Sequence, residues 1–159
     1  MGPHLRGRAQ GLSGPAAPAI SIHSLAQAVA ALEISVAGRH AIVLLSARDA
    51  GIYAGPGWWA ALIEAAREAL PAARCAAILD CGDDAGAAMA AIRAGVEAIV
   101  FTGRADVAER LEDIATAQGC RLLTERPDAL LDLGDLFFAD AETLRRRCAD
   151  ALASPKAIC

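Results

Sequence analysis

The stretch AIVLLSARDAGIYAG, residues 41–55, decides the fold. Its first five residues are apolar without a break, and a loop with polar residues and glycines follows before the next helical pattern begins. Short continuous apolar runs are typical of strands in a parallel sheet whose faces are covered by helices. A similar unit precedes this one and others follow it, so the sequence predicts a series of parallel βα units.

The apolar spacing places these units along most of the chain. We expect strands at residues 19–22, 40–45, 75–79, 97–101 and 121–123, and helices at residues 25–36, 58–70, 85–94 and 106–118. This pattern predicts an α/β fold with about five parallel strands, either a half (β/α) barrel or an open flavodoxin-like sheet. A complete eight-stranded barrel needs about 250 residues, and the chain has 159.

Both ends of the chain depart from this pattern. Residues 1–18 are rich in glycine and proline, and we expect a flexible arm there. After Pro127 the pattern changes, and a helix at about 141–152 is expected to cover an edge of the sheet. Residues 19–159 are therefore predicted to form a single domain.

The composition excludes several functions. Fifteen Lys and Arg stand against nineteen Asp and Glu, a net charge of −4, which argues against general binding to nucleic acids or anionic membranes. No apolar run has the roughly 20 residues that a bilayer span needs, and a cytoplasmic location is the simplest expectation. Lys156 is the only lysine, so a Schiff-base or phosphate-loop lysine is set aside.

The residues just after each expected strand are the candidates for a site, because sites in such folds form at the carboxyl ends of the strands. After the second strand, Ser46 offers a hydroxyl and Arg48 a guanidinium, and backbone N–H groups lie near a helix start at Gly55. This combination suits an anionic ligand such as a phosphorylated small molecule. Arg104, after the fourth strand, is a further candidate. The alternative is an ordinary surface loop.

Acidic residues and a thiol follow the third strand, in Asp80-Cys81-Gly82-Asp83-Asp84. Asp83 or Asp84 is expected to cap the next helix, whereas Asp80 ends a buried strand and is the candidate general acid. His23 also follows a strand, so a thiolate pair with Cys81 or a partial zinc site is one reading. A structural histidine is the alternative.

In their order along the chain, these strand ends resemble the N-terminal half of class II, metal-dependent fructose-bisphosphate and tagatose-bisphosphate aldolases. Residues 41–55 look like that family's PVI-x-x-S-x-G-A-x-x-Y-A-G stretch. Residues 79–82, LDCG, look like its L-D-H-G, and residues 91–100, AIRAGVEAIV, look like its A-I-x-x-G-F-x-S-V-M. The resemblance covers about residues 19–125.

This resemblance implies roles for three residues. Asp80 matches the catalytic proton-transferring aspartate, Ser46 matches a contact to the substrate phosphate, and Cys81 stands where the family has a zinc-binding histidine. The chain also departs from the family. Leu123 replaces a glutamate of the fifth strand, residues 102–104 replace an Asp-Gly-Ser, and no histidine follows His40.

The leading hypothesis is therefore an aldolase-like protein without lyase activity. It would act as a binding or regulatory module with affinity for a sugar phosphate through Ser46 and Arg48. The alternative is a metal-dependent ketose-bisphosphate aldolase that is active only as an oligomer or with a partner, with Asp80 as acid and base. A receiver-like signalling domain fits poorly, because no acidic cluster follows the first strand. A half barrel exposes sheet edges, so a homo-oligomer or a protein partner is expected.

Overall fold

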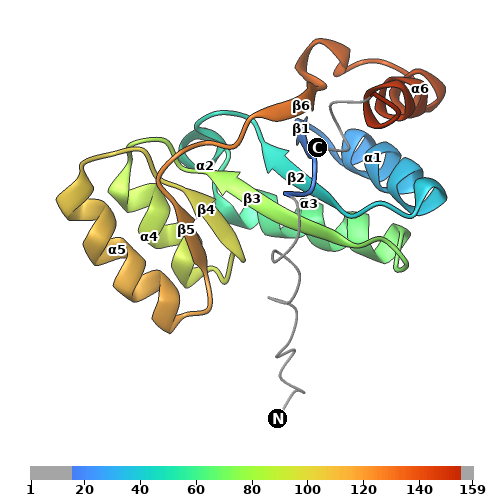
Figure 1. Cartoon of the computed structure of the whole chain (residues 1–159). Coiled ribbons are helices and arrows are strands. Elements are labelled where there is room, and N and C mark those ends of the chain that lie inside the picture. The colour runs from blue at the N-terminus through green and yellow to red at the C-terminus, as the bar shows by residue number, and fades with distance from the viewer. Residues whose placement is uncertain (1–15, 155–159) are drawn as a thin grey trace.

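The computed structural model describes residues 16–154 and shows an α/β fold (Figure 1). Six parallel strands are joined into a sheet with the order β5-β4-β3-β2-β1-β6. The strands are β1 (Ala19–Ile22), β2 (Ile42–Ser46), β3 (Cys75–Asp80), β4 (Ala98–Val100), β5 (Arg121–Leu123) and β6 (Ala129–Asp132). The helices are α1 (Leu25–Gly38), α2 (Ala50–Tyr53), α3 (Pro56–Ala69), α4 (Ala85–Arg93), α5 (Ala105–Ala117), the 3₁₀ turn η1 (Gly134–Leu136) and α6 (Ala141–Leu152).

Side chains cap the starts of α1, α4 and α6. The Asp84 carboxylate accepts the N–H of Ala87 at 2.8 Å and begins α4, which confirms the capping role expected for Asp83 or Asp84. In α3, Trp59 is buried and Trp58 lies at the surface. The predicted arm at residues 1–18 lies largely outside the described residues.

The strand order selects the barrel-like alternative. Strands β1 to β5 are neighbours in chain order, as in a (β/α) barrel, whereas a flavodoxin-like sheet has the order 2-1-3-4-5. Helices α1, α3, α4 and α5 pack side by side in the same sequence. The larger core cluster lies between these helices and the sheet, and a smaller one contains only strand residues. The expected half-barrel architecture of parallel βα units is confirmed.

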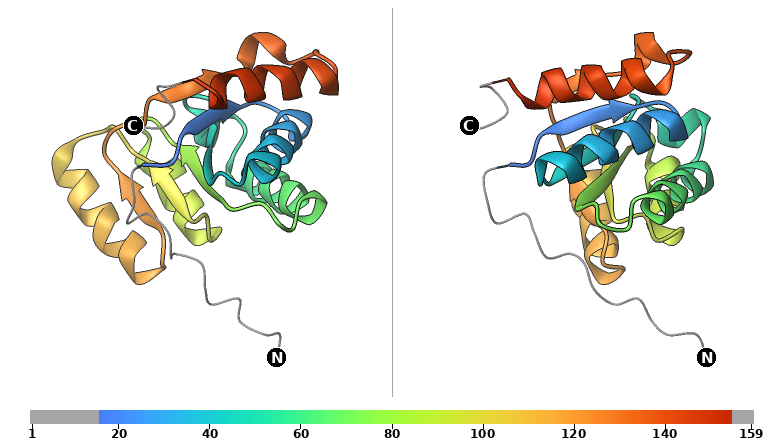
Figure 2. Two further views of the ribbon diagram at one scale, coloured as in Figure 1. Left: turned by 45° about the vertical axis from the view of Figure 1, so that its right-hand side comes forward. Right: turned by 90° about the vertical axis from the view of Figure 1, so that its right-hand side faces the viewer.

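The sixth strand was not expected. Residues 129–132 pair in parallel with β1, with Ala19 opposite Ala129, and α6 packs against α1. The C-terminal segment therefore covers an edge of the sheet by extending it. Thr124 to Asp128 alone connect β5 to β6, and Figures 1 and 2 show this connection running from one end of the sheet to the other.

The length of this connection, which we call the bridge (residues 124–128), requires a curved sheet. The six Cα–Cα steps from Leu123 to Ala129 reach about 20–22 Å at most. The two edges of a flat six-stranded sheet would be about 24 Å apart, from five spacings of about 4.8 Å. The sheet must therefore curl, and the bridge closes the open side of the partial barrel. No helix within residues 16–154 is long and apolar enough to cross a membrane.

Candidate functional site

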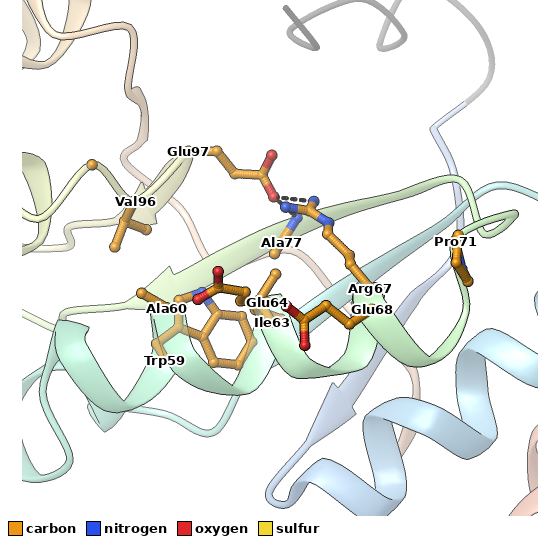
Figure 3. Close-up of a pocket in the computed structure, with 11 residues that line it drawn as sticks. Trp59, Ala60, Ile63, Glu64, Arg67, Glu68, Pro71, Ala77, Val96 and Glu97 are labelled. Carbon is orange, nitrogen blue, oxygen red and sulfur yellow. Dashed lines mark hydrogen bonds and ion pairs between the residues drawn. The ribbon is translucent and has the colours of Figure 1, made fainter. Parts of the chain in front are cut away.

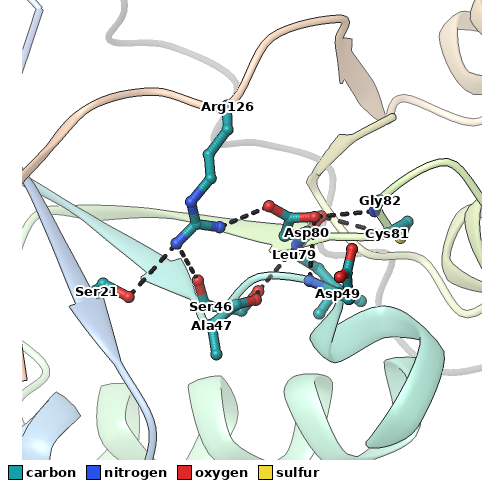
Figure 4. A network of polar contacts seen from close by, with 9 residues as sticks. All are labelled: Ser21, Ser46, Ala47, Asp49, Leu79, Asp80, Cys81, Gly82 and Arg126. Atoms are coloured by element: carbon teal, nitrogen blue, oxygen red, sulfur yellow. Dashed lines mark hydrogen bonds and ion pairs between the residues drawn. The ribbon is translucent and has the colours of Figure 1, made fainter. Parts of the chain in front are cut away.

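Asp80 ends β3 and lies at the centre of a polar network at the carboxyl ends of the strands (Figure 4). The residue is 4% exposed. Its Oδ2 accepts a hydrogen bond from Arg126 Nη1 at 2.6 Å, and its Oδ1 accepts the backbone N–H of Gly82 at 2.8 Å and of Asp49 at 3.3 Å. Both carboxylate oxygens are therefore engaged within the chain.

Arg126 comes from the bridge and reaches three strand ends at once (Figure 4). Besides its contact with Asp80 on β3, its Nη2 donates to the carbonyl oxygen of Ser46 on β2 at 2.8 Å and contacts Ser21 Oγ on β1 at 3.5 Å. The side chains of Arg126 and Asp80 are only 11% and 5% exposed. The guanidinium therefore fills the space beside the carboxylate and ties the bridge to the sheet.

Ser46 lies in this network, but its hydroxyl is used internally. Its Oγ donates to the carbonyl of Ala47 at 2.9 Å and accepts the backbone N–H of Asp80 at 2.9 Å. The residue is fully buried. As placed, this hydroxyl connects β2 to β3 and is not presented to a ligand.

The other candidates for anion binding make no contact with Asp80. Arg48 is exposed on the loop after β2, and Gly55 caps α3 with a φ of 86°. Arg104 is 80% exposed and pairs with Asp106 of α5 at 2.9 Å. No hydrogen bond or ion pair within residues 16–154 joins any of these three to Asp80, so the structure does not assemble the five predicted residues into one site.

The two candidate metal ligands do not converge either. Cys81 is buried in the core between sheet and helices, and a Cβ on Gly51 of α2 would come within 2.7 Å of its Sγ. Burial, assisted by the charge of Asp80, raises the pKa of the Cys81 thiol to about 12, so it is protonated at neutral pH. His23 Nε2 instead lies 2.8 Å from Asp132 Oδ1.

These positions do not fit a zinc centre, which needs deprotonated, converging ligands. Among residues 16–154, no group of three His, Cys, Asp or Glu side chains is placed to hold a metal ion.

Three residues that make these contacts were not singled out from the sequence. Arg126 and Ser21 lie in the stretches at the strand ends where site residues were sought, but neither was chosen as a candidate. Asp132, the partner of His23, lies on the unexpected β6. The positions of Arg126 and Ser21 gave a signal, but nothing in the sequence indicated that Arg126 points inward.

The fold of this chain is similar to that of a solved structure. A crystal structure from Coccidioides immitis, described as a putative fructose-1,6-bisphosphate aldolase, is similar with a TM-score of 0.54 and 20% identity. The match covers 67% of this chain and 39% of that chain, so this chain spans well under half the length of its structural neighbour. No protein-family model and no curated protein matches the sequence. The fold is therefore aldolase-like, and the structural likeness extends no further.

Proposed function

We propose that this protein is a binding module on an aldolase-like fold, without lyase activity of its own. The observation that carries the proposal is the buried pair of Asp80 and Arg126, 2.6 Å apart. An acid or base must reach the substrate proton directly or through one water. Asp80 can do so only if Arg126 leaves, and separating such a buried pair costs about 3–5 kcal/mol.

An exposed arginine supports the proposed binding of a phosphate ester. Arg48 is exposed on the loop after β2, and its guanidinium supports the expected affinity for a phosphate ester. The buried Ser46 would contribute only after a rearrangement.

Exposed aromatic side chains support a protein partner or a second copy. Tyr53 and Trp58 follow β2, and Phe137 and Phe138 follow β6, with Phe138 96% exposed. Large apolar side chains gathered at one end of a domain are typical of association surfaces. We propose that this carboxyl-end surface mediates association.

The test of the missing lyase activity uses fructose 1,6-bisphosphate with and without added zinc. We expect no cleavage by the purified protein under either condition. Zinc-dependent cleavage that disappears in Asp80→Asn would overturn the proposal and favour an aldolase that is completed in an oligomer.

The ligand is tested by calorimetric titration with dihydroxyacetone phosphate. Binding that weakens in Arg48→Ala but not in Arg104→Ala supports the phosphate-ester role. Absence of heat in both the wild type and the variants removes that role and leaves the protein-binding one.

A further inference from the structure

A groove at the opposite, amino-terminal side of the sheet has no part in the network around Asp80 (Figure 3). Its volume is about 500 Å³, within the usual range for small-molecule sites. One wall is α3, and the other is formed by β3 and the residues that lead into β4. The groove is therefore a separate candidate for binding.

The groove exists because β3 and β4 separate toward their amino ends. The two strands pair only at Leu79 with Ile99 and at Asp80 with Val100. Closer to the amino end of β3, the backbone N–H of Ala77 donates to Glu97 Oε1 at 2.7 Å and not to a neighbouring strand. The opening between the strands is thus held by side chains.

An ion pair spans this opening (Figure 3). Arg67 Nη2 of α3 donates to Glu97 Oε1 at 2.7 Å and to the carbonyl of Cys75 at 3.0 Å. Burial opposes the charge on Arg67, but the contacts with Glu97 and Cys75 together outweigh burial and raise the pKa of the guanidinium above its usual value. The positive charge of Arg67 is therefore already matched within the wall.

The remaining charge of the groove is negative. Glu64 and Glu68 are exposed and line it beside Glu97, so three carboxylates face one guanidinium that is already paired. The floor is apolar and includes Ile63 and Val96. Such a surface favours a ligand with positive charges and hydrocarbon segments.

Trp59 gives an independent indication that the chain does not complete this surface. The residue is 1% exposed and lines the groove (Figure 3). Its indole N–H has no hydrogen-bond acceptor among residues 16–154, although every fully buried polar side-chain atom described has a partner. This atom is therefore not sealed in the core, and it belongs to a residue that lines the groove.

The shape of the groove favours a linear ligand. Trp59 and Arg67 lie eight residues apart on one face of α3, which corresponds to about 12 Å along the helix axis. Glu64 lies between them on the same helix, and Glu68 follows one turn later, next to Arg67. Positive charges spaced along a flexible chain would meet these carboxylates in turn.

We propose that this groove binds a linear aliphatic polyamine, with ammonium groups at Glu64 and Glu68 and its methylene segments on the apolar floor. The proposal does not depend on the proposed function, because the groove lies away from Asp80 and the exposed aromatic surface. Binding of this kind weakens with added salt because the carboxylates are partly exposed.

The test uses the fluorescence of Trp59 in the full-length Trp58→Phe variant, where it is the only remaining tryptophan. Titration with spermidine is expected to change this fluorescence saturably, and calorimetry of the wild-type protein should give the same affinity. Magnesium supplies charge without a hydrocarbon chain, and 1,5-pentanediol supplies the chain without charge. Both are expected to bind at least tenfold more weakly.

Two matched double variants locate the binding. Glu64→Gln with Glu68→Gln should weaken spermidine binding by up to about fivefold for each carboxylate. Glu109→Gln with Glu112→Gln removes two exposed carboxylates from α5 and should leave the affinity unchanged. All four glutamates are exposed, so the fold is expected to persist. Equal binding of magnesium, equal effects of the two double variants, or no binding by either method would overturn the proposal.

Discussion

Two arginine–carboxylate pairs lie at opposite ends of the same sheet. They differ in burial rather than in the distance between the charged groups. Arg126 and Asp80 lie 2.6 Å apart at the carboxyl ends, with side chains 11% and 5% exposed. Arg67 and Glu97 lie 2.7 Å apart at the amino ends, with side chains 42% and 37% exposed. Distance alone therefore does not rank the two pairs. Solvent access decides how much each contributes to stability and what else can bind there.

The two ends of the sheet also differ in the space that they leave for a ligand. In (β/α) barrels, sites form at the carboxyl ends of the strands, and the amino ends contribute to stability. Here the buried Asp80–Arg126 pair closes the carboxyl end, whereas the amino end keeps a groove of about 500 Å³. In this chain Asp80 is held in an ion pair within the chain, and the groove lies at the other end of the sheet.

The largest expected effect is that of Arg126→Ala. The substitution leaves Asp80 buried without its partner, so we expect the free energy of unfolding to fall by about 3–5 kcal/mol. Urea denaturation measures this change. The double variant with Asp80→Ala should lose less than the two single variants together. Purely additive losses would mean that the two side chains are not coupled.

A smaller effect is expected for Arg67→Ala at the amino end. Because this pair is partly exposed, its loss should reduce the free energy of unfolding by about 1 kcal/mol or less. Arg93→Ala, at an exposed position on α4, is the matched control and should change it by less still. If Arg67→Ala reduces the free energy of unfolding as much as Arg126→Ala does, burial does not explain the difference between the two pairs.

The pH dependence of stability due to Asp132 tests whether the contribution of a carboxylate depends on its end of the sheet or on its burial. This carboxylate lies at the carboxyl end but is 60% exposed. Burial works to raise its pKa, but the N–H of Gly134 and the contact with His23 outweigh burial and leave the pKa lowered. A lowered folded pKa gives stability that is present above the unfolded value of about 3.9 and is lost as the pH falls through the folded pKa.

Urea midpoints at pH 6 and pH 3 should therefore differ more for the wild type than for Asp132→Asn. The same comparison keeps Asp140, whose pKa is lowered by the N–H of Thr143, in both proteins. Identical pH dependence in the two proteins would show that the His23–Asp132 contact does not contribute to folding.

The smallest expected effect on stability is that of Phe138→Ser. This side chain is 96% exposed, so the free energy of unfolding should change by no more than about 0.5 kcal/mol. Sedimentation velocity at micromolar concentrations should nevertheless show weaker association than in the wild type. A wild-type protein that is monomeric throughout this range would contradict the proposed association surface.

The sequence predicted the regular part of the fold because its strands are continuous apolar runs. The expected strand at residues 121–123 agrees with β5, and the expected helix at about 141–152 agrees with α6. Strand β6 was missed because residues 129–132 are half-exposed at an edge and do not stand out from a covering loop.

The candidate site was predictable only in part. Asp80 and Ser46 do come together, because parallel strands end at one edge of the sheet. The partner of Asp80 could not be predicted, because Arg126 turns inward only when the bridge crosses a curved sheet. Glu97 and Arg67 lie at the amino ends, where no site is expected, and their pairing depends on the separation of β3 from β4.

The pairing of β1 with β6 has a consequence for biosynthesis. Ala19 is among the first described residues to leave the ribosome, and its partner Ala129 is made more than a hundred residues later. During translation, one edge of β1 stays unpaired until residues 129–132 have been synthesised, and Arg126 cannot reach Asp80 before it has itself been made. The sheet is therefore expected to complete its folding only after these residues have left the ribosome.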